Sequence, residues 1–167
     1  VYEFVTNIVY KKTKNNSVRE IKKLRSLLYN RNEYIFITDF GAGSTINKSK
    51  KRKIKDIAKN SSKNSKYGEF LYRIVEFYKP KKILELGTSF GISTCYLAKG
   101  NINSQLQTFE GCPSTAKIAQ QNFKQLEIKN TDIIVGDFKN TLAKNINTDI
   151  DLAFVDGNHN KQSTIEY

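Results

Sequence analysis

The chain has 167 residues, long enough for one domain or for a core domain with an appendage, and its 38% of hydrophobic residues suits a soluble globular protein. No apolar run approaches the roughly 20 residues that a membrane-spanning helix needs. No basic segment precedes the apolar N-terminal residues, as it would in a signal peptide. We therefore expect a cytoplasmic protein without membrane contact. Because the chain contains no Met and begins with Val, we also expect its natural start to be missing.

The net charge of +12 lies entirely in the N-terminal half of the chain. Residues 1–80 hold 19 Lys and Arg against 7 Asp and Glu, whereas residues 81–167 hold 9 of each kind. This asymmetry predicts a basic, mainly helical region at 1–80 and a separate neutral domain at 81–167. A basic arm at 48–66 for nucleic acid is one interpretation of the charge; AT-biased coding, which enriches Lys, Asn and Ile, is another.

The N-terminal region is predicted to be mostly helical, because apolar residues recur there at helical spacing. The predicted helices lie at 2–10, 17–29, 50–59 and 67–78. Ser17 and Glu20 fit a capping box for the second helix. Residues 34–38 predict a short strand, and the glycines of 38–44 predict a turn near the mouth of the active site. The polar stretch 47–66 is expected to be flexible, with a hinge at 60–66.

From Lys81 onward, strands and helices alternate regularly. The predicted strands lie at 82–86, 105–110, 131–135 and 150–155, and the intervening helices at 91–99, 113–126 and 138–146. This alternation predicts a parallel α/β sheet flanked by helices, with all strands ending at the same edge, where such sheets bind ligands. A strand at 150–155 would leave a hydrophobic edge unpaired, so we expect a fragment of a longer protein or a homodimer.

The end of the first predicted strand carries Glu85 and the turn Gly87-Thr88-Ser89-Phe90-Gly91. The glycines allow a sharp bend and the close approach of a ligand. The turn leads into the N-terminus of a helix, where free N–H groups and the hydroxyls of Ser93 and Thr94 suit a carboxylate or a phosphate.

The other three strand ends also carry acidic residues. Glu110, followed by Gly111, stands 19 residues after Gly91, a position from which a carboxylate can accept both ribose hydroxyls. Asp137 could bind an adenine amino group and Phe138 could cover the ring. Asp156 and His159, the only histidine, would lie beside the reactive end of a cofactor. Each also has a structural interpretation: Glu110 as a surface charge, Asp137 as a helix cap, Asp156 as a turn residue and His159 as a solvated loop residue.

Taken together, the motifs ILELGTSFG, FEGCP, VGDF and DLAFVDGNH resemble class I S-adenosylmethionine-dependent methyltransferases, and among them the small-molecule O-methyltransferase branch. The resemblance covers residues 81–167. It implies a Rossmann-like sheet that is incomplete, with strands one to four of seven, and S-adenosyl-L-methionine as the cofactor.

The same resemblance implies a role for each matched residue. Glu85 and the Gly87–Gly91 turn would cradle the methionine moiety, and Ser93 would bind its carboxylate. Glu110 would bind the ribose and Asp137 the adenine. Asp156 matches an acidic position that binds a divalent cation in some relatives, but their further ligands do not appear before the chain ends, so no metal is expected.

The expected function is methyl transfer from S-adenosylmethionine to an oxygen or nitrogen of a small-molecule acceptor, with Asp156 or His159 as a general base. The alternative is an RNA-binding protein or RNA methyltransferase that uses 48–66, although no aromatic residue interleaves with these charges before Tyr67. An NAD-dependent dehydrogenase fits less well, because the first turn lacks the G-x-G-x-x-G pattern.

Cys95 and Cys112 lack metal-ligand spacing and are expected to be buried thiols.

Overall fold

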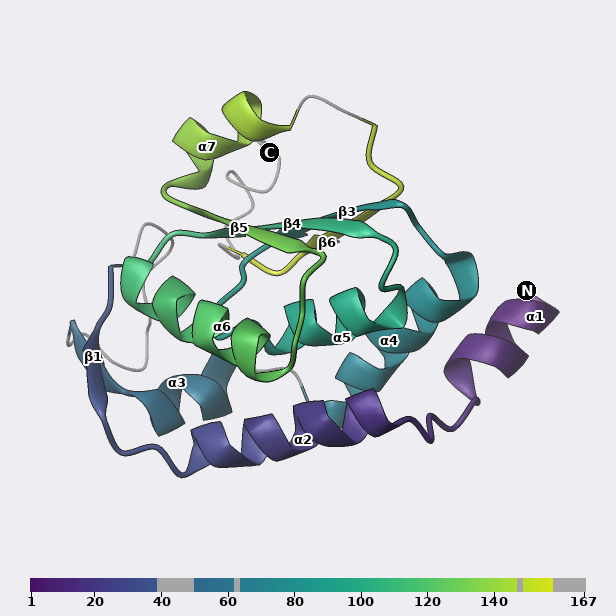
Figure 1. Cartoon of the computed structure of the whole chain (residues 1–167), viewed down its shortest axis with the longest axis horizontal. Helices are drawn as coiled ribbons and strands as arrows, with labels where there is room; N and C mark the ends of the chain where they lie inside the picture. The colour runs from purple at the N-terminus through teal and green to yellow at the C-terminus, as the bar shows by residue number, and fades with distance from the viewer. Residues whose placement is uncertain (39–49, 62–63, 147–148, 158–167) are drawn as a thin grey trace.

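The structure is a computed structural model and describes residues 1–38, 50–61, 64–146 and 149–157. At its centre is a parallel four-stranded sheet in the order β5-β4-β3-β6 (Figure 1). Its strands are β3 (Lys82–Leu86), β4 (Gln105–Glu110), β5 (Thr131–Val135) and β6 (Leu152–Val155). The predicted α/β fold with a parallel sheet is therefore confirmed, and only the last strand begins later than expected.

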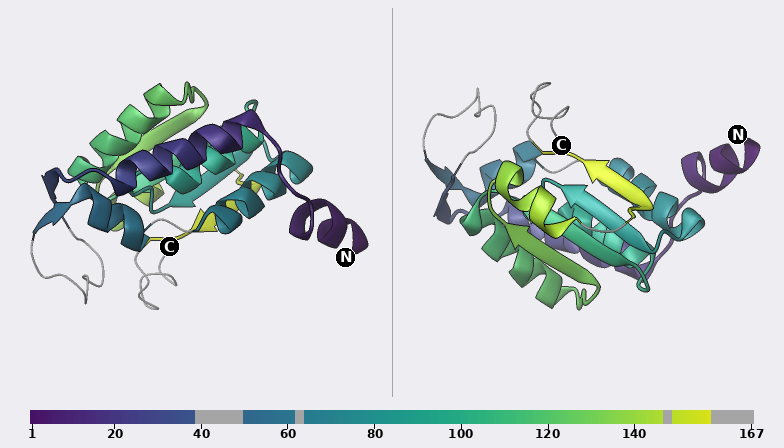
Figure 2. Two further views of the ribbon diagram at one scale, coloured as in Figure 1. Left: turned by 90° about the horizontal axis from the view of Figure 1, so that it is seen from below. Right: turned by 90° about the horizontal axis from the view of Figure 1, so that it is seen from above.

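Helices cover both faces of this sheet (Figure 2). The first face is covered by α4 (Ser65–Tyr78), α5 (Ile92–Gly100) and α6 (Pro113–Gln125), and the opposite face by α7 (Phe138–Asn145). Side chains of β3 alternate between the two layers: Ile83 packs with α4 and α5, whereas Leu84 and Leu86 pack with Phe138 and α7. Because both faces are covered, β3 is buried along nearly its whole length.

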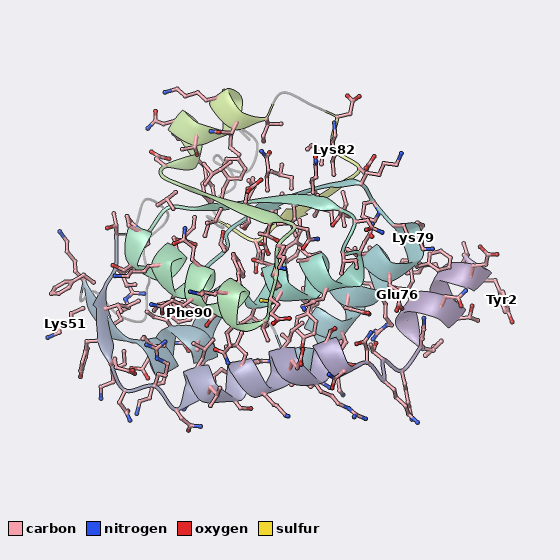
Figure 3. All side chains as sticks on the ribbon, viewed as in Figure 1. Tyr2, Lys51, Glu76, Lys79, Lys82 and Phe90 are labelled. Atoms are coloured by element: carbon pink, nitrogen blue, oxygen red, sulfur yellow. The ribbon has the colours of Figure 1, made fainter. Side chains whose placement is uncertain are left out.

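A further layer of N-terminal helices lies beneath α5 and α6. It consists of α2 (Asn16–Tyr29) and α3 (Ile54–Ser61). Ile21 and Leu28 of α2 share a core cluster with Phe90, Tyr96 and Phe123 of the sheet domain, and Figure 3 shows Phe90 between these layers. The basic region therefore packs directly on the sheet domain, and the division into two domains near residue 80 stays a prediction.

The start of the chain is held by a buried arginine. Residues Tyr2–Phe4 form a short helix, α1, that continues as the π-helix η1 (Val5–Val9). Arg73 of α4 donates from Nε to the carbonyl of Ile8 at 2.5 Å and from Nη1 to the hydroxyl of Thr13 at 3.1 Å. These two bonds, with Glu69 at 4.0 Å, provide polar partners for the side chain of a residue that is only 7% exposed.

Helix α2 begins differently from the sequence prediction. The side chain of Asn15 accepts the N–H of Ser17 at 2.8 Å and is the N-cap. The capping box predicted at Ser17 is therefore wrong, because Asn15 has the extended backbone that a cap requires and Ser17 already lies within the helix.

Residues 51–53, expected to be helical or flexible, pair with the strand predicted at 34–38 and form a two-stranded antiparallel ribbon. Strand β2 (Lys51–Lys53) pairs with β1 (Tyr34–Phe36), so the helix expected at 50–59 begins only at Ile54. Within 51–61 the strand and the helix α3 are regular and Ile54 and Ala58 are buried, whereas the flexibility expected for 47–66 stays a prediction. The glycines predicted to form a turn at 38–44 lie outside the described residues.

Two further sequence expectations concern membranes and thiols. None of the helices in the described ranges is long and apolar enough to cross a membrane. Cys95 and Cys112 are buried and form no disulfide, as predicted.

Candidate functional site

The four turns that follow the strands of the sheet are linked by backbone hydrogen bonds along the edge where the strands end. The N–H groups of Gly87 and Thr88 both approach the carbonyl of Phe109, at 3.0 and 3.1 Å. Gly136 donates to the carbonyl of Glu110 at 2.9 Å, and Asp156 donates to that of Leu86 at 2.8 Å. The structure thus brings the acidic and glycine-rich corners onto a single rim.

Two glycines of the first turn have backbone angles that favour glycine. Gly87 has φ +100°, and a Cβ there would lie 2.8 Å from the carbonyl of Asp156. Gly91 has φ +76°, and a Cβ there would lie 2.4 Å from the ring of Phe123. These glycines therefore allow close packing against the fourth turn and against α6, and their contact with a ligand stays a prediction.

Glu110 links the first and second turns through its side chain. Its Oε2 accepts the backbone N–H of Ser89 at 2.7 Å, and its Oε1 accepts that of Cys112 at 2.8 Å, beyond Gly111. The side chain is half-buried. Each carboxylate oxygen carries two lone pairs, so both can accept a further donor. Two backbone groups thus fix the orientation of a carboxylate at the rim.

Glu85 lies beneath the rim and is fully buried. Its carboxyl group accepts hydrogen bonds from the hydroxyls of Ser93 at 2.6 Å, of Thr108 at 2.7 Å and of Thr94. Burial raises the pKa of Glu85 to about 7; the hydroxyl donors oppose this rise, and the nearby Asp156 adds to it. This carboxyl group therefore joins the first turn of α5 to β4.

Thr108 is a member of this cluster that the sequence analysis missed. Its hydroxyl also lies 2.6 Å from that of Thr88, and parallel pairing places it directly across from Glu85. A threonine inside a strand carries no motif, and only the register of β3 with β4 shows where it points. Thr88 and Thr94, both predicted as cofactor ligands, are buried and direct their hydroxyls into the same cluster.

The third and fourth turns complete the rim. Asp137 accepts the N–H of Lys139 at 3.1 Å and caps α7, the structural role considered from the sequence. Phe138 is buried, packs edge-on against Phe109 at 6.5 Å between ring centroids, and adjoins Gly157. Asp156 is half-buried at the end of β6. His159 lies outside the described residues.

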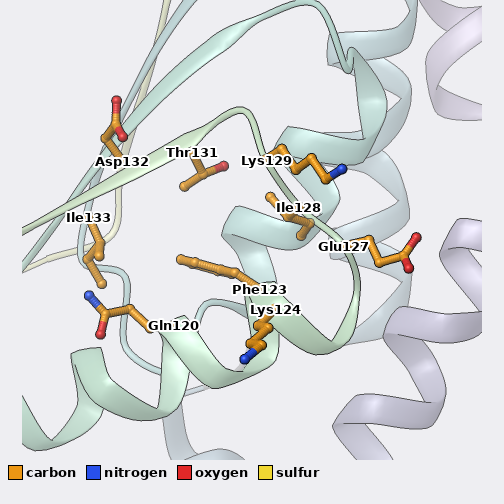
Figure 4. A pocket seen from close by; sticks show the side chains of 9 residues that line it. All are labelled: Gln120, Phe123, Lys124, Glu127, Ile128, Lys129, Thr131, Asp132 and Ile133. Atoms are coloured by element: carbon orange, nitrogen blue, oxygen red, sulfur yellow. The ribbon is translucent and has the colours of Figure 1, made fainter.

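A depression of about 640 Å³ lies elsewhere, between the end of α6 and the beginning of β5 (Figure 4). It is lined by Phe123, Lys124, Ile128, Thr131 and Asp132 among others. Thr131 begins β5, at the end opposite to the rim, and no acidic residue of the rim lines this depression, so it is not part of the candidate site. Across the described ranges, no three His, Cys, Asp or Glu side chains are grouped to hold a metal ion.

Comparison with known proteins agrees with this geometry. Residues 84–167 match the family model described as "Methyltransferase domain". Catechol O-methyltransferase of Mycobacterium tuberculosis (strain ATCC 25618 / H37Rv) is 27% identical over 106 residues, which are 62% of this chain and 47% of that protein.

Two solved structures share the fold. The SAH-bound methyltransferase PaMTH1 of Podospora anserina superposes with a TM-score of 0.65 at 20% identity, over 90% of this chain and 53% of its own. The O-methyltransferase of Bacillus cereus in complex with SAH gives a TM-score of 0.58 at 18% identity, over 92% of this chain and 58% of its own.

The fold and the matched family model define the class: the chain belongs to the family of methyltransferase-domain proteins, with the Rossmann-like sheet that its motifs predict. The chain spans about half the length of the curated relative it matches.

Proposed function

We propose that the chain binds S-adenosylmethionine at this rim and transfers its methyl group to an oxygen of a small acceptor molecule. The observation that carries the proposal is the half-buried Glu110 carboxylate, held by the N–H groups of Ser89 and Cys112. Membership of the methyltransferase-domain family supports the reaction class. Two similar proteins, the catechol O-methyltransferase and the O-methyltransferase of Bacillus cereus, favour oxygen over nitrogen as the accepting atom.

The chemistry of the rim suits the cationic and hydroxyl-bearing parts of this cofactor. Glu110 would accept hydrogen bonds from the ribose hydroxyls, because its fixed oxygens retain free lone pairs. Glu85, beneath the rim, would favour the positively charged methionine end through its negative field once it is ionised, above its pKa of about 7. Because the hydroxyl of Ser93 already donates to Glu85, its backbone N–H in the first turn of α5 would bind the methionine carboxylate, near the positive end of the helix dipole.

The adenine would lie toward the third turn. Asp137 uses one oxygen to cap α7, and its carboxylate has capacity for an adenine amino donor. Phe138 would contribute an apolar surface for the adenine. Gly111, which follows Glu110 in the chain, would lie on the opposite side of that carboxylate.

When bound, S-adenosylmethionine supplies an electrophilic methyl group that an acceptor oxygen can attack. The contribution of the chain is mainly alignment, because direct displacement needs the two reacting atoms in line. Asp156, at the end of β6, would accept the proton that the acceptor hydroxyl loses, which makes it the general base of this proposal. The corresponding role for His159 stays a prediction, as do a homodimer and the cytoplasmic location.

Calorimetric titration of the purified chain with S-adenosylmethionine, S-adenosylhomocysteine (SAH) and NAD tests the proposal. We expect both sulfur-containing nucleosides to bind and NAD not to bind, because the turn Gly87–Gly91 lacks the glycine pattern of dinucleotide sites. Formation of SAH with hydroxylated aromatic acceptors would extend the result to catalysis. Binding of NAD alone would overturn the assignment.

A further inference from the structure

The ribbon formed by β1 and β2 exposes two aromatic rings directly across from two lysines. Tyr34 pairs with Lys53 and Phe36 with Lys51, so all four side chains share one face of the ribbon. Tyr34 is 54% exposed and Phe36 is 69% exposed. Ile35, between them, turns to the other face and packs against the core. Two large aromatic side chains are therefore exposed to solvent at strand positions where polar residues could stand.

Positive charge surrounds these rings. The ammonium groups of Lys51 and Lys53 lie 5.1 and 5.3 Å from the centroid of the Tyr34 ring. Lys50 and Arg52 adjoin them in the chain, within the region that carries the whole net charge of the protein. Figure 3 shows Lys51 on the outer side of the ribbon, away from the sheet.

We propose that this face of the ribbon binds single-stranded nucleic acid, with bases stacked on Phe36 and Tyr34 and phosphates paired with Lys51 and Lys53. Aromatic residues two positions apart on a strand are about 7 Å apart. Strand-borne rings are the means by which sheet-based RNA-binding modules stack successive unpaired bases. An acidic peptide would pair with the lysines but would not stack on the exposed ring of Phe36, whereas a nucleic acid supplies both phosphates and bases.

The structure also removes the objection that the sequence raised to nucleic-acid binding. Among residues 48–66 no aromatic side chain interleaves with the basic ones. Strand pairing supplies the missing rings from Tyr34 and Phe36, which lie about 15 to 20 residues earlier in the chain. The interleaving of rings and charges therefore exists in space and not along the sequence.

The ribbon is joined to the candidate active site. The N–H of Thr38 donates to Sγ of Cys112 at 3.3 Å, and this thiol approaches the carbonyl of Phe36 at 3.7 Å. Cys112 in turn donates its N–H to Glu110. A strand bound to the ribbon would therefore lie beside the rim, although its binding does not require the proposed methyl transfer.

Fluorescence anisotropy with labelled oligouridylate and oligothymidylate of 12 nucleotides tests this proposal on the full chain. We expect binding to the single strands, with a clear preference over a 12-base-pair RNA duplex, whose bases are not free to stack. Phe36→Ala should weaken binding roughly 5-fold to 100-fold and leave the salt dependence unchanged. The double substitution Lys51→Gln and Lys53→Gln should weaken binding. It should also reduce the slope of the logarithm of the binding constant against the logarithm of the salt concentration by about 0.7 for each lost phosphate contact. Comparing the two oligomers distinguishes RNA from DNA as the source of the strand.

The matched control is the pair Lys124→Gln and Lys129→Gln, two exposed lysines of which one lies in the last turn of α6 and the other follows the helix (Figure 4). It removes the same charge and should leave binding within about twofold of wild type. Equal weakening by both lysine pairs, no binding at 50 mM salt, or binding to phosphatidylserine vesicles without binding to either oligomer would each overturn the proposal. Thermal melting confirms that each variant is folded.

Discussion

Glu85 is a carboxyl group without solvent contact whose oxygens accept three hydroxyl donors. Burial raises its pKa from 4.5 to about 7. Between these two values the folded state keeps a proton that the unfolded state releases. Stability is therefore fully present below pH 4.5 and is lost as the pH rises to about 7, by roughly 3 kcal/mol in total.

Urea unfolding of wild type and Glu85→Gln at pH 5 and pH 8 measures this linkage. We expect wild type to lose roughly 2–3 kcal/mol more than the variant between these two conditions, because the amide does not titrate. Glu127→Gln, on an exposed side chain, should keep the wild-type profile. Identical pH dependence of wild type and Glu85→Gln would contradict this account.

Thr108 and Thr131 offer a matched comparison of two strand threonines. The Thr108 hydroxyl bonds to Glu85 and contacts Thr88, whereas the buried Thr131 hydroxyl has no hydrogen-bond partner among the residues that the structure describes. Thr108→Val should cost about 1–3 kcal/mol, because it leaves a buried acceptor with one donor fewer. Thr131→Val should be neutral or stabilising, because it removes a polar group that has no compensation. Chemical denaturation of both variants checks the difference, and equal costs would count against the role given to Thr108.

At the scale of elements, α4 and α5 approach closely at Gly68. A Cβ at this position would lie 2.2 Å from the ring of Tyr96, which is fully buried. Alanine normally favours a helix over glycine by about 1 kcal/mol. Here the substitution must displace an aromatic ring between two packed helices, which costs typically 1–3 kcal/mol or more.

Gly68→Ala is therefore expected to lower the melting temperature, in spite of the helix propensity of alanine. In a Tyr96→Ala background the same substitution should have no such cost, since the ring that it meets is gone. A double-mutant cycle with thermal melting measures this coupling. Additive effects of the two substitutions would mean that α4 and α5 do not meet at this position.

The strands and the ribbon differ in how far their sequences predict them. Residues 82–86, 105–110 and 131–135 form strands as predicted, since apolar runs and intervening helices determine their positions locally. Lys51–Lys53 has no apolar pattern, and its strand depends on pairing with Tyr34–Phe36, a contact between distant parts of the chain. Such pairing overrides local propensity and is not readable from one sequence.

The candidate site divides in the same way. The acidic strand ends are predictable, because parallel strands bring their C-terminal ends to one edge. The two backbone donors on Glu110 and the position of Thr108 opposite Glu85 depend on turn conformation and strand register, which no motif encodes.

At the scale of the whole molecule, β6 is an edge strand. Among the described residues it pairs only with β3, and Val155 is 47% exposed. An open apolar edge promotes association with another strand. We expect the 167-residue chain to self-associate in a concentration-dependent way, as measured by light scattering. A monodisperse monomer at all concentrations would contradict the expected homodimer.

The central claim is that the rim of the sheet holds the nucleoside of the cofactor through Glu110. Calorimetric titration with SAH of wild type, Glu110→Gln and the control Glu127→Gln tests it most directly. Loss of a charged acceptor for ribose hydroxyls costs about 1.5–3 kcal/mol, so we expect Glu110→Gln to bind roughly 10- to 100-fold more weakly and the control to bind like wild type. Unchanged affinity in a folded Glu110→Gln protein would contradict the account.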